Sequence, residues 1–172
     1  MKTLKEYKVS FADLKIGEHR FGFQVDSAFF EKFPESEILR ANIKISLIMD
    51  KRENMLVLYF DINGDVEITC DRCLDEFRFP IKTKEKLIVK FGKEYEELSD
   101  DMIVIPTKTH HIDLQQHIYE YIMLSLPIQR IHPDLPDGES GCNQIMLHHL
   151  NTVNETHKAD PRWDALRNLI NN

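Results

Sequence analysis

The sequence predicts an α+β fold: an antiparallel β meander, in the form of a curled sheet or partial barrel, followed by C-terminal helices and a long Pro/Gly loop. Three observations indicate this class. Apolar and polar residues alternate in short runs between residues 7 and 91, as in half-buried strands. The apolar period then changes to that of a helix over residues 113–125. Prolines and glycines are concentrated in residues 127–142.

The strands are predicted from these runs, taken in chain order. They lie at residues 7–11, 21–25, 43–47, 55–62, 66–68, 77–79 and 87–91. Asn63-Gly64 separates two of the runs and is the strongest two-residue hairpin signal, so a tight turn is expected there. The acidic run Glu94–Asp101 is interpreted as a solvated loop. A further short strand is expected at residues 102–105.

The helices are predicted from apolar residues that share one helical face. In the first, the face contains Leu114, Ile118, Tyr121 and Ile122, with Asp113 as the N-cap. A short helix is expected around residues 145–150, and a last one over residues 160–170, which begin with Asp-Pro. The chain of 172 residues is therefore expected to be a single domain over residues 1–172, β-rich to about residue 105 and helical from about residue 112.

Composition and charge exclude several functional classes. A net charge of −7 argues against broad, unspecific binding to nucleic acid or to membrane surfaces. No apolar run is long enough to span a bilayer, and the N-terminus lacks the apolar stretch of an export signal. The 3 cysteines, an odd number, then indicate a reducing compartment. We therefore expect a cytoplasmic protein without a membrane partner.

The clearest chemical motif is Cys70-Asp71-Arg72-Cys73. Two thiolates at this spacing can bind one tetrahedral metal ion, but a closed zinc site needs four ligands. Cys142 and His132, both in the Pro/Gly loop, are the candidates for the third and fourth ligands, with His148 or His149 in reserve. One structural zinc is the expected cofactor.

Two other interpretations of the cysteine pair remain open. Cys70 and Cys73 can be buried, inert thiols at the end of a strand. They can also form a redox pair, although such pairs belong at a helix N-terminus, and here strand-like alternation lies on both sides.

Basic residues recur near and after this motif. A period of two places most of them on one strand face, opposite Phe77 and Leu87, which suggests a contact surface for an RNA backbone or an acidic protein. The competing interpretation is an ordinary solvated sheet face. The basic residues are Arg72, Arg78, Lys82, Lys84, Lys86 and Lys90.

The sequence contains none of the common catalytic signatures. There is no nucleophile elbow, no Gly-rich phosphate loop and no zinc-protease motif. We therefore expect a protein that is not an enzyme and has no small-molecule substrate. A thiol enzyme or nuclease is the alternative, and it rests only on the spare histidine and acidic residues.

Taken together, the motifs resemble the YceD-like family, whose members are named for accumulation of large-subunit ribosomal RNA. The resemblance is carried by four short segments in the same order as in the family. They are Asn63-Gly64-Asp65, the C-x-R-C-L-x-x-F core at residues 70–77, the D-L…L-x-L-P helix at residues 113–127, and the D-P-R-x-x-x-L ending at residues 160–166.

The resemblance implies a non-enzymatic factor for large-subunit rRNA accumulation and large ribosomal subunit assembly. Its implied partner is a large-subunit rRNA precursor or a basic large-subunit ribosomal protein. Many members carry a second cysteine pair after the L-P, whereas here His132 stands at the first of those positions and Cys142 is the one cysteine left. Under this interpretation a Cys-Cys-His-Cys site replaces the four-cysteine site, and the alternative is a site that no longer binds metal. The alternative function is a zinc-stabilised protein-interaction module unrelated to ribosomes.

Overall fold

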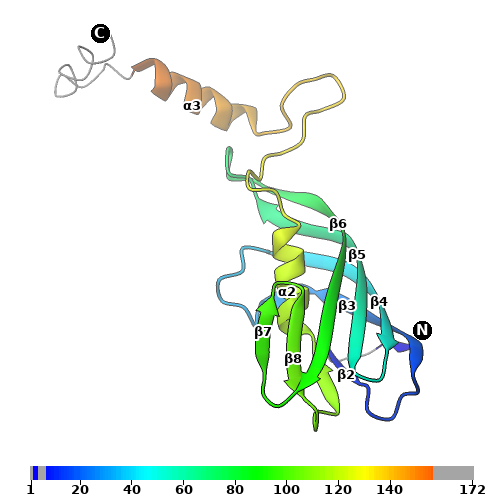
Figure 1. Ribbon diagram of the computed structural model, residues 1–172. Helices are drawn as coiled ribbons and strands as arrows, with labels where there is room; N and C mark the ends of the chain where they lie inside the picture. Colours follow the sequence, from blue (N-terminus) through cyan, green and yellow to red (C-terminus); the bar gives the residue numbers. More distant parts are fainter. Residues whose placement is uncertain (1, 4–6, 157–172) are drawn as a thin grey trace, which may run out of the picture. The chain divides into compact units, whose positions relative to one another are not determined.

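The structure is a computed structural model that describes residues 2–3 and 7–156 of the chain (Figure 1). The chain forms two compact units. The first comprises Met1–Thr69 and Glu76–Arg130, and the second comprises Cys70–Asp75 and Ile131–Asn172. The expectation of a single domain, in which the two units would unfold together, stays a prediction. The helix predicted over residues 160–170 lies outside the described residues.

The first unit is built on a seven-stranded sheet. Its strand order is β1-β3-β4-β5-β6-β8-β7, and it is not closed into a barrel among the described residues. A separate two-stranded sheet pairs β2 with β9. The strands are β1 (Lys2–Thr3), β2 (Lys8–Ser10), β3 (Gly17–Asp26), β4 (Arg40–Lys51), β5 (Met55–Thr69), β6 (Glu76–Gly92), β7 (Glu96–Ser99), β8 (Met102–Pro106) and β9 (His111–Asp113).

The antiparallel meander predicted from the sequence is found in β3 to β6. Each of these strands pairs with the next along its length. The sheet as a whole is mixed, because β1 pairs in parallel with β3 and β8 pairs in parallel with β6. The acidic run interpreted as a loop instead contains β7, which pairs with β8 at the edge of the sheet.

The tight turn predicted at Asn63-Gly64 is wrong. Both residues lie inside β5, where Gly64 pairs with Ile43 on one side and Ile81 on the other. A Cβ atom on Gly64 would lie 2.2 Å from the backbone oxygen of Asn42, so this glycine permits a close approach of β4. Pairing with two neighbouring strands therefore outweighs the local turn preference of the dipeptide.

One face of the sheet is covered by α2 (Gln115–Leu124). The helix buries Ile118, Tyr121 and Ile122 against the sheet, as its sequence pattern predicts. The ring of Tyr121 packs edge-on against Phe60 of β5, at 5.3 Å between ring centroids. The N-cap position of the helix is Leu114 and not Asp113 as predicted, although the Asp113 side chain accepts a hydrogen bond from the backbone N–H of Gln115. A shorter helix, α1 (Ser27–Phe30), follows β3.

The second unit has little regular structure. It consists of the turn between β5 and β6, an irregular segment with a bridge between Asp134 and Ser140, and α3 (Gln144–Thr156). Among its described residues, only the three cysteines have fully buried side chains. The unit therefore lacks an ordinary apolar core in the part of the chain that is described. None of the described helices is long and apolar enough to cross a bilayer.

Candidate metal centre

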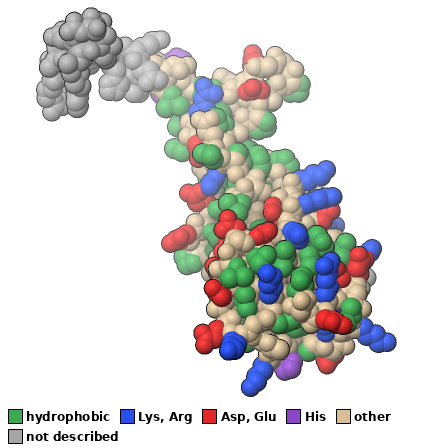
Figure 2. All heavy atoms as spheres, viewed as in Figure 1, with side chains coloured by type: hydrophobic (Ala, Val, Ile, Leu, Met, Phe, Trp, Pro, Cys, Tyr) green, Lys and Arg blue, Asp and Glu red, His purple; other side chains and the backbone are tan. Residues whose placement is uncertain are grey.

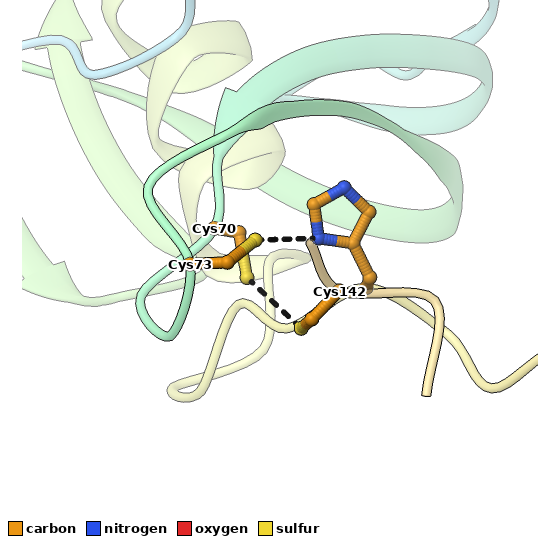
Figure 3. A group of neighbouring side chains, drawn as sticks. Cys70, Cys73 and Cys142 are labelled. Carbon is orange, nitrogen blue, oxygen red and sulfur yellow. Dashed lines mark hydrogen bonds between the residues drawn. The ribbon is translucent and has the colours of Figure 1, made fainter. Parts of the chain in front are cut away.

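Three thiols and one imidazole converge in the second unit. The ligand atoms of Cys70, Cys73, His132 and Cys142 all lie within 4.8 Å of one another. Figure 3 shows the Cys70 and Cys73 side chains, from the turn after β5, facing Cys142 from the Pro/Gly segment. The structure thus brings together the four residues that the sequence predicted as ligands.

The turn that carries the first two cysteines is held by its own backbone. The N–H of Cys70 donates to the carbonyl of Asp75, and the N–H of Leu74 donates to the carbonyl of Cys70. Leu74 has a φ of 63°, which is uncommon for a residue with a side chain. The N–H of Arg72 also points at the Cys70 sulfur, at 3.4 Å. These contacts direct both sulfurs toward the same side of the turn.

A tight loop delivers the other two ligands. Within residues 132–142, the N–H of Leu135 donates to the carbonyl of Glu139, and Gly138 takes a φ of 85°. A Cβ atom on Gly141 would lie 2.3 Å from the carbonyl oxygen of Pro133, so glycine is needed where the two ends of the loop meet. The loop closure therefore places His132 beside Cys142.

Asn143 joins the turn, the loop and α3 of the second unit. Its amide nitrogen donates to Asp75 at 3.0 Å, and its amide oxygen accepts from the N–H of Ile145, also at 3.0 Å. The residue thus caps α3 while tying it to the cysteine turn. Sequence reasoning did not single out Asn143, although an asparagine directly before a helical run is an N-cap signal.

Two distances within the cluster match those expected around a tetrahedral zinc ion. The Cys70 and Cys142 sulfurs are 3.8 Å apart, and the Cys73 sulfur is 3.4 Å from Nδ1 of His132. Zinc–sulfur bonds of about 2.3 Å at the tetrahedral angle place two sulfurs about 3.8 Å apart, and the sulfur–nitrogen edge is about 3.5 Å. A disulfide requires about 2.05 Å between sulfurs, so the thiols here are free.

The pKa values of the Cys70 and Cys142 thiols shift in opposite directions. Burial opposes ionisation of Cys70, but hydrogen bonds from the backbone of Cys73 and Arg72 and from His132 outweigh it and lower the pKa to about 6. Burial raises the pKa of Cys142, and its neighbours Cys70 and Cys73 add to that effect. A thiolate at Cys70 is a suitable first ligand for a cation.

The reserve ligands and the redox interpretation receive less support. His148 and His149 are exposed on α3, and neither belongs to the cluster of described residues. The pair Cys70 and Cys73 lies at a strand end in a turn, followed by β6 and not by a helix. Helix N-termini are what lower the thiol pKa in thioredoxin-like pairs.

The basic residues predicted to share one strand face do so on β6, but acidic residues partly neutralise their charge. Arg78 and Lys84 point to solvent and pair with Asp65 and Asp61 of β5, at 3.8 and 3.9 Å. Lys82, Lys86 and Lys90 occupy the same strand face. Arg72 lies in the second unit, in the cysteine turn, so it is not part of this strand. Acidic residues of the neighbouring strand thus lower the net charge of this strand face.

Comparison with known proteins places the chain in a family. Residues 58–170 match the family described as "Large ribosomal RNA subunit accumulation protein YceD". The chain belongs to this family. The YceD match covers all four residues of the candidate metal cluster, together with β6, α2 and α3. No curated protein and no solved structure matches the chain.

Proposed function

We propose that this chain is a non-enzymatic factor that supports accumulation of large-subunit ribosomal RNA and assembly of the large ribosomal subunit. The observation that carries the proposal is the YceD family match over residues 58–170. The protein would act in the cytoplasm, where bacterial ribosomes are assembled. Its partner would be a large-subunit rRNA precursor or a basic large-subunit ribosomal protein, and the net charge of −7 favours the basic protein.

We also propose that Cys70, Cys73, His132 and Cys142 bind one structural zinc ion. Three soft thiolates and one imidazole form a donor set that zinc prefers, and four protein ligands leave no open position for catalysis. The ion would serve in place of the missing apolar core, because the fully buried side chains described in this unit are the three cysteines.

A deletion of the gene in its own organism tests the first proposal. We expect the ratio of large-subunit to small-subunit rRNA to fall, and the wild-type gene to restore it. Complementation with Cys73→Ser tests whether the cluster is needed, and His148→Ala, an exposed histidine of α3, is the matched control. Normal rRNA ratios and normal subunit profiles after deletion would reject the assembly role.

A pull-down of the tagged chain from that organism tests the partner. Recovery of rRNA precursor that declines steeply with salt would indicate phosphate contacts. Recovery of a basic large-subunit protein without RNA would indicate a protein contact.

The second candidate function is a zinc-stabilised interaction module unrelated to ribosomes. The observation that favours it is the clustering of four ligands in a unit without an apolar core. Stoichiometric zinc in the purified protein, combined with normal rRNA after deletion, would support this second function over the first.

A further inference from the structure

A second feature lies in the first unit, away from the cysteines in the sequence. A cleft of about 1310 Å³ is lined by residues of α2, β7, β8 and β9 and by part of β6. Figure 2 shows Asp and Glu side chains gathered on the side of this unit where β7 lies. The acidic residues that line the cleft are Glu85, Glu97, Asp100, Asp101, Asp113 and Glu120.

Most of these carboxylates lack a cationic partner. Among the described residues, Asp113 alone of the six forms an ion pair, with Lys8 at 3.8 Å. Several of the others accept hydrogen bonds from neutral groups: Glu97 from the hydroxyl of Tyr95, and Glu120 from the amide of Gln116. Lys86 is the one lysine or arginine in the lining. The lining of the cleft therefore carries a net negative charge.

Apolar side chains lie between these charges. Ile103 and Ile105 of β8 form part of the lining and are almost fully buried. Leu98 and Leu124 also line the cleft but are exposed, at 47% and 81% of their surface. Exposed leucines beside acidic residues suit a ligand that has aliphatic stems ending in positive charges.

A buried hydroxyl provides an independent observation. Tyr121 lines the cleft and is 7% exposed, yet its hydroxyl has no hydrogen-bond partner among the described residues. Burial, followed by the charges of Glu85, Glu120 and Asp101, raises the pKa of Tyr121 to about 12, so the group stays a donor. Nδ1 of His117, one turn earlier, is also buried without a partner. Buried polar groups without a partner are rare in folded proteins, and a bound water, an ion or a ligand can complete them.

We propose that this cleft binds an extended, lysine- and arginine-rich segment of a partner protein. The ammonium and guanidinium groups of the segment pair with the carboxylates that lack a cationic partner, and its aliphatic stems cover the exposed side chains of Leu98 and Leu124. A backbone carbonyl of the segment accepts a hydrogen bond from Tyr121 once the side chains that cover its hydroxyl shift to admit the segment. RNA is disfavoured as the occupant, because its phosphates carry the same charge as the cleft. The proposal goes beyond the rRNA role and does not depend on it.

Binding of a defined peptide to the full-length protein tests this proposal. The probe is a fluorescent twelve-residue peptide in which lysine and arginine alternate with leucine and alanine. We expect saturable binding that weakens with salt, and none for the same peptide with glutamate at the basic positions. The variant Glu85→Gln/Glu97→Gln/Glu120→Gln should bind about tenfold more weakly, given the usual energy of exposed ion pairs.

The matched control changes the net charge equally but outside the cleft. In Glu18→Gln/Glu35→Gln/Glu53→Gln, the altered residues do not line the cleft, and binding should stay within about twofold of wild type. Equal losses in the two triple variants would overturn the proposal, because only net charge would then matter. Equal binding of the acidic peptide would also overturn it, as would displacement of the basic peptide by an RNA oligonucleotide that binds the cleft directly.

Tyr121→Phe separates binding from folding. We expect this variant to bind the peptide several-fold more weakly while its thermal midpoint rises, because an unpartnered buried hydroxyl is removed. A hydroxyl with no role in binding would raise the midpoint and leave peptide affinity unchanged, and that result would contradict its assigned contact.

Discussion

At the scale of single residues, the candidate metal cluster contains one imidazole among three thiols. His132 lies in a loop that also supplies Cys142, and its Nδ1 is 3.4 Å from the Cys73 sulfur. We expect natively purified wild-type protein to contain about one zinc per chain, His132→Ala to lose most of it, and His148→Ala to retain it. Metal analysis by mass spectrometry measures this. Equal zinc contents in the two histidine variants would remove His132 from the ligand set.

A second residue-scale prediction concerns the unpartnered hydroxyl of Tyr121. Its removal in Tyr121→Phe should raise the free energy of unfolding by about 1 kcal/mol, because the folded state no longer buries a polar group without a hydrogen bond. Urea denaturation of the free protein gives the value. A decrease in stability would mean that the hydroxyl has a partner in solution.

His117 predicts how stability depends on pH. Burial lowers its pKa from 6.5, and the nearby carboxylates of Glu120, Glu97 and Asp113 only partly offset that effect. Below the unfolded pKa, the folded state therefore binds fewer protons at His117 than the unfolded state does. The free energy of unfolding is not reduced by this group above the unfolded pKa, and it decreases as the pH falls below that value. In denaturation series between about pH 8 and pH 5, His117→Gln should lose less stability on acidification than wild type. Parallel curves would contradict this assignment.

At the scale of elements, Gly64 shows why the hairpin prediction failed. A turn preference is local, whereas β5 gains two full ladders of pairing, with β4 and with β6. Gly64→Ala should lower stability by about 2–3 kcal/mol, because the new methyl group meets the backbone of Asn42 and something must shift. Asn63→Ala, at the neighbouring exposed position, is the control and should change stability little. A similar cost for both variants would argue against the close approach.

Periodicity predicted other elements well. The basic residues of β6 all fall at even positions and most of them are exposed, while Phe77, Ile81 and Leu87 at odd positions are buried, as a period of two requires. The apolar face of α2 was also readable from its spacing. The edge strand β7 was missed because its four residues are all exposed and none can contribute a pattern of burial.

The candidate site was partly predictable for a chemical reason. Few residue types bind zinc, so the ligand set could be predicted from the positions of three cysteines and a nearby histidine in the sequence. The loop conformation was not predictable, because Gly141 acts through a contact with Pro133 that no local pattern encodes. The acidic cleft was equally hidden, since its residues come from five separate elements.

At the scale of the whole molecule, the two units should differ in their dependence on metal. The second unit buries only cysteines among its described residues, whereas the first buries the apolar face of a large sheet. Chelation should therefore increase hydrogen exchange in residues 131–152 and leave the centre of β5 protected. Exchange measured with and without a chelator tests this. Uniform protection in both states would show that the second unit does not need an ion.

The position of the cysteine turn between the two longest strands determines the order in which the candidate ligands are synthesised. Cys70 and Cys73 follow β5 directly, but Cys142 is made 69 residues after Cys73. At translation rates of about 5–20 residues per second, this separation lasts roughly 3–14 seconds. The strands of the meander have left the ribosome by then, while Cys70 and Cys73 have not yet met the other two candidate ligands. The interval in which these thiols are open to oxidation is thus set by the order of the sequence, and closure of the second unit comes last.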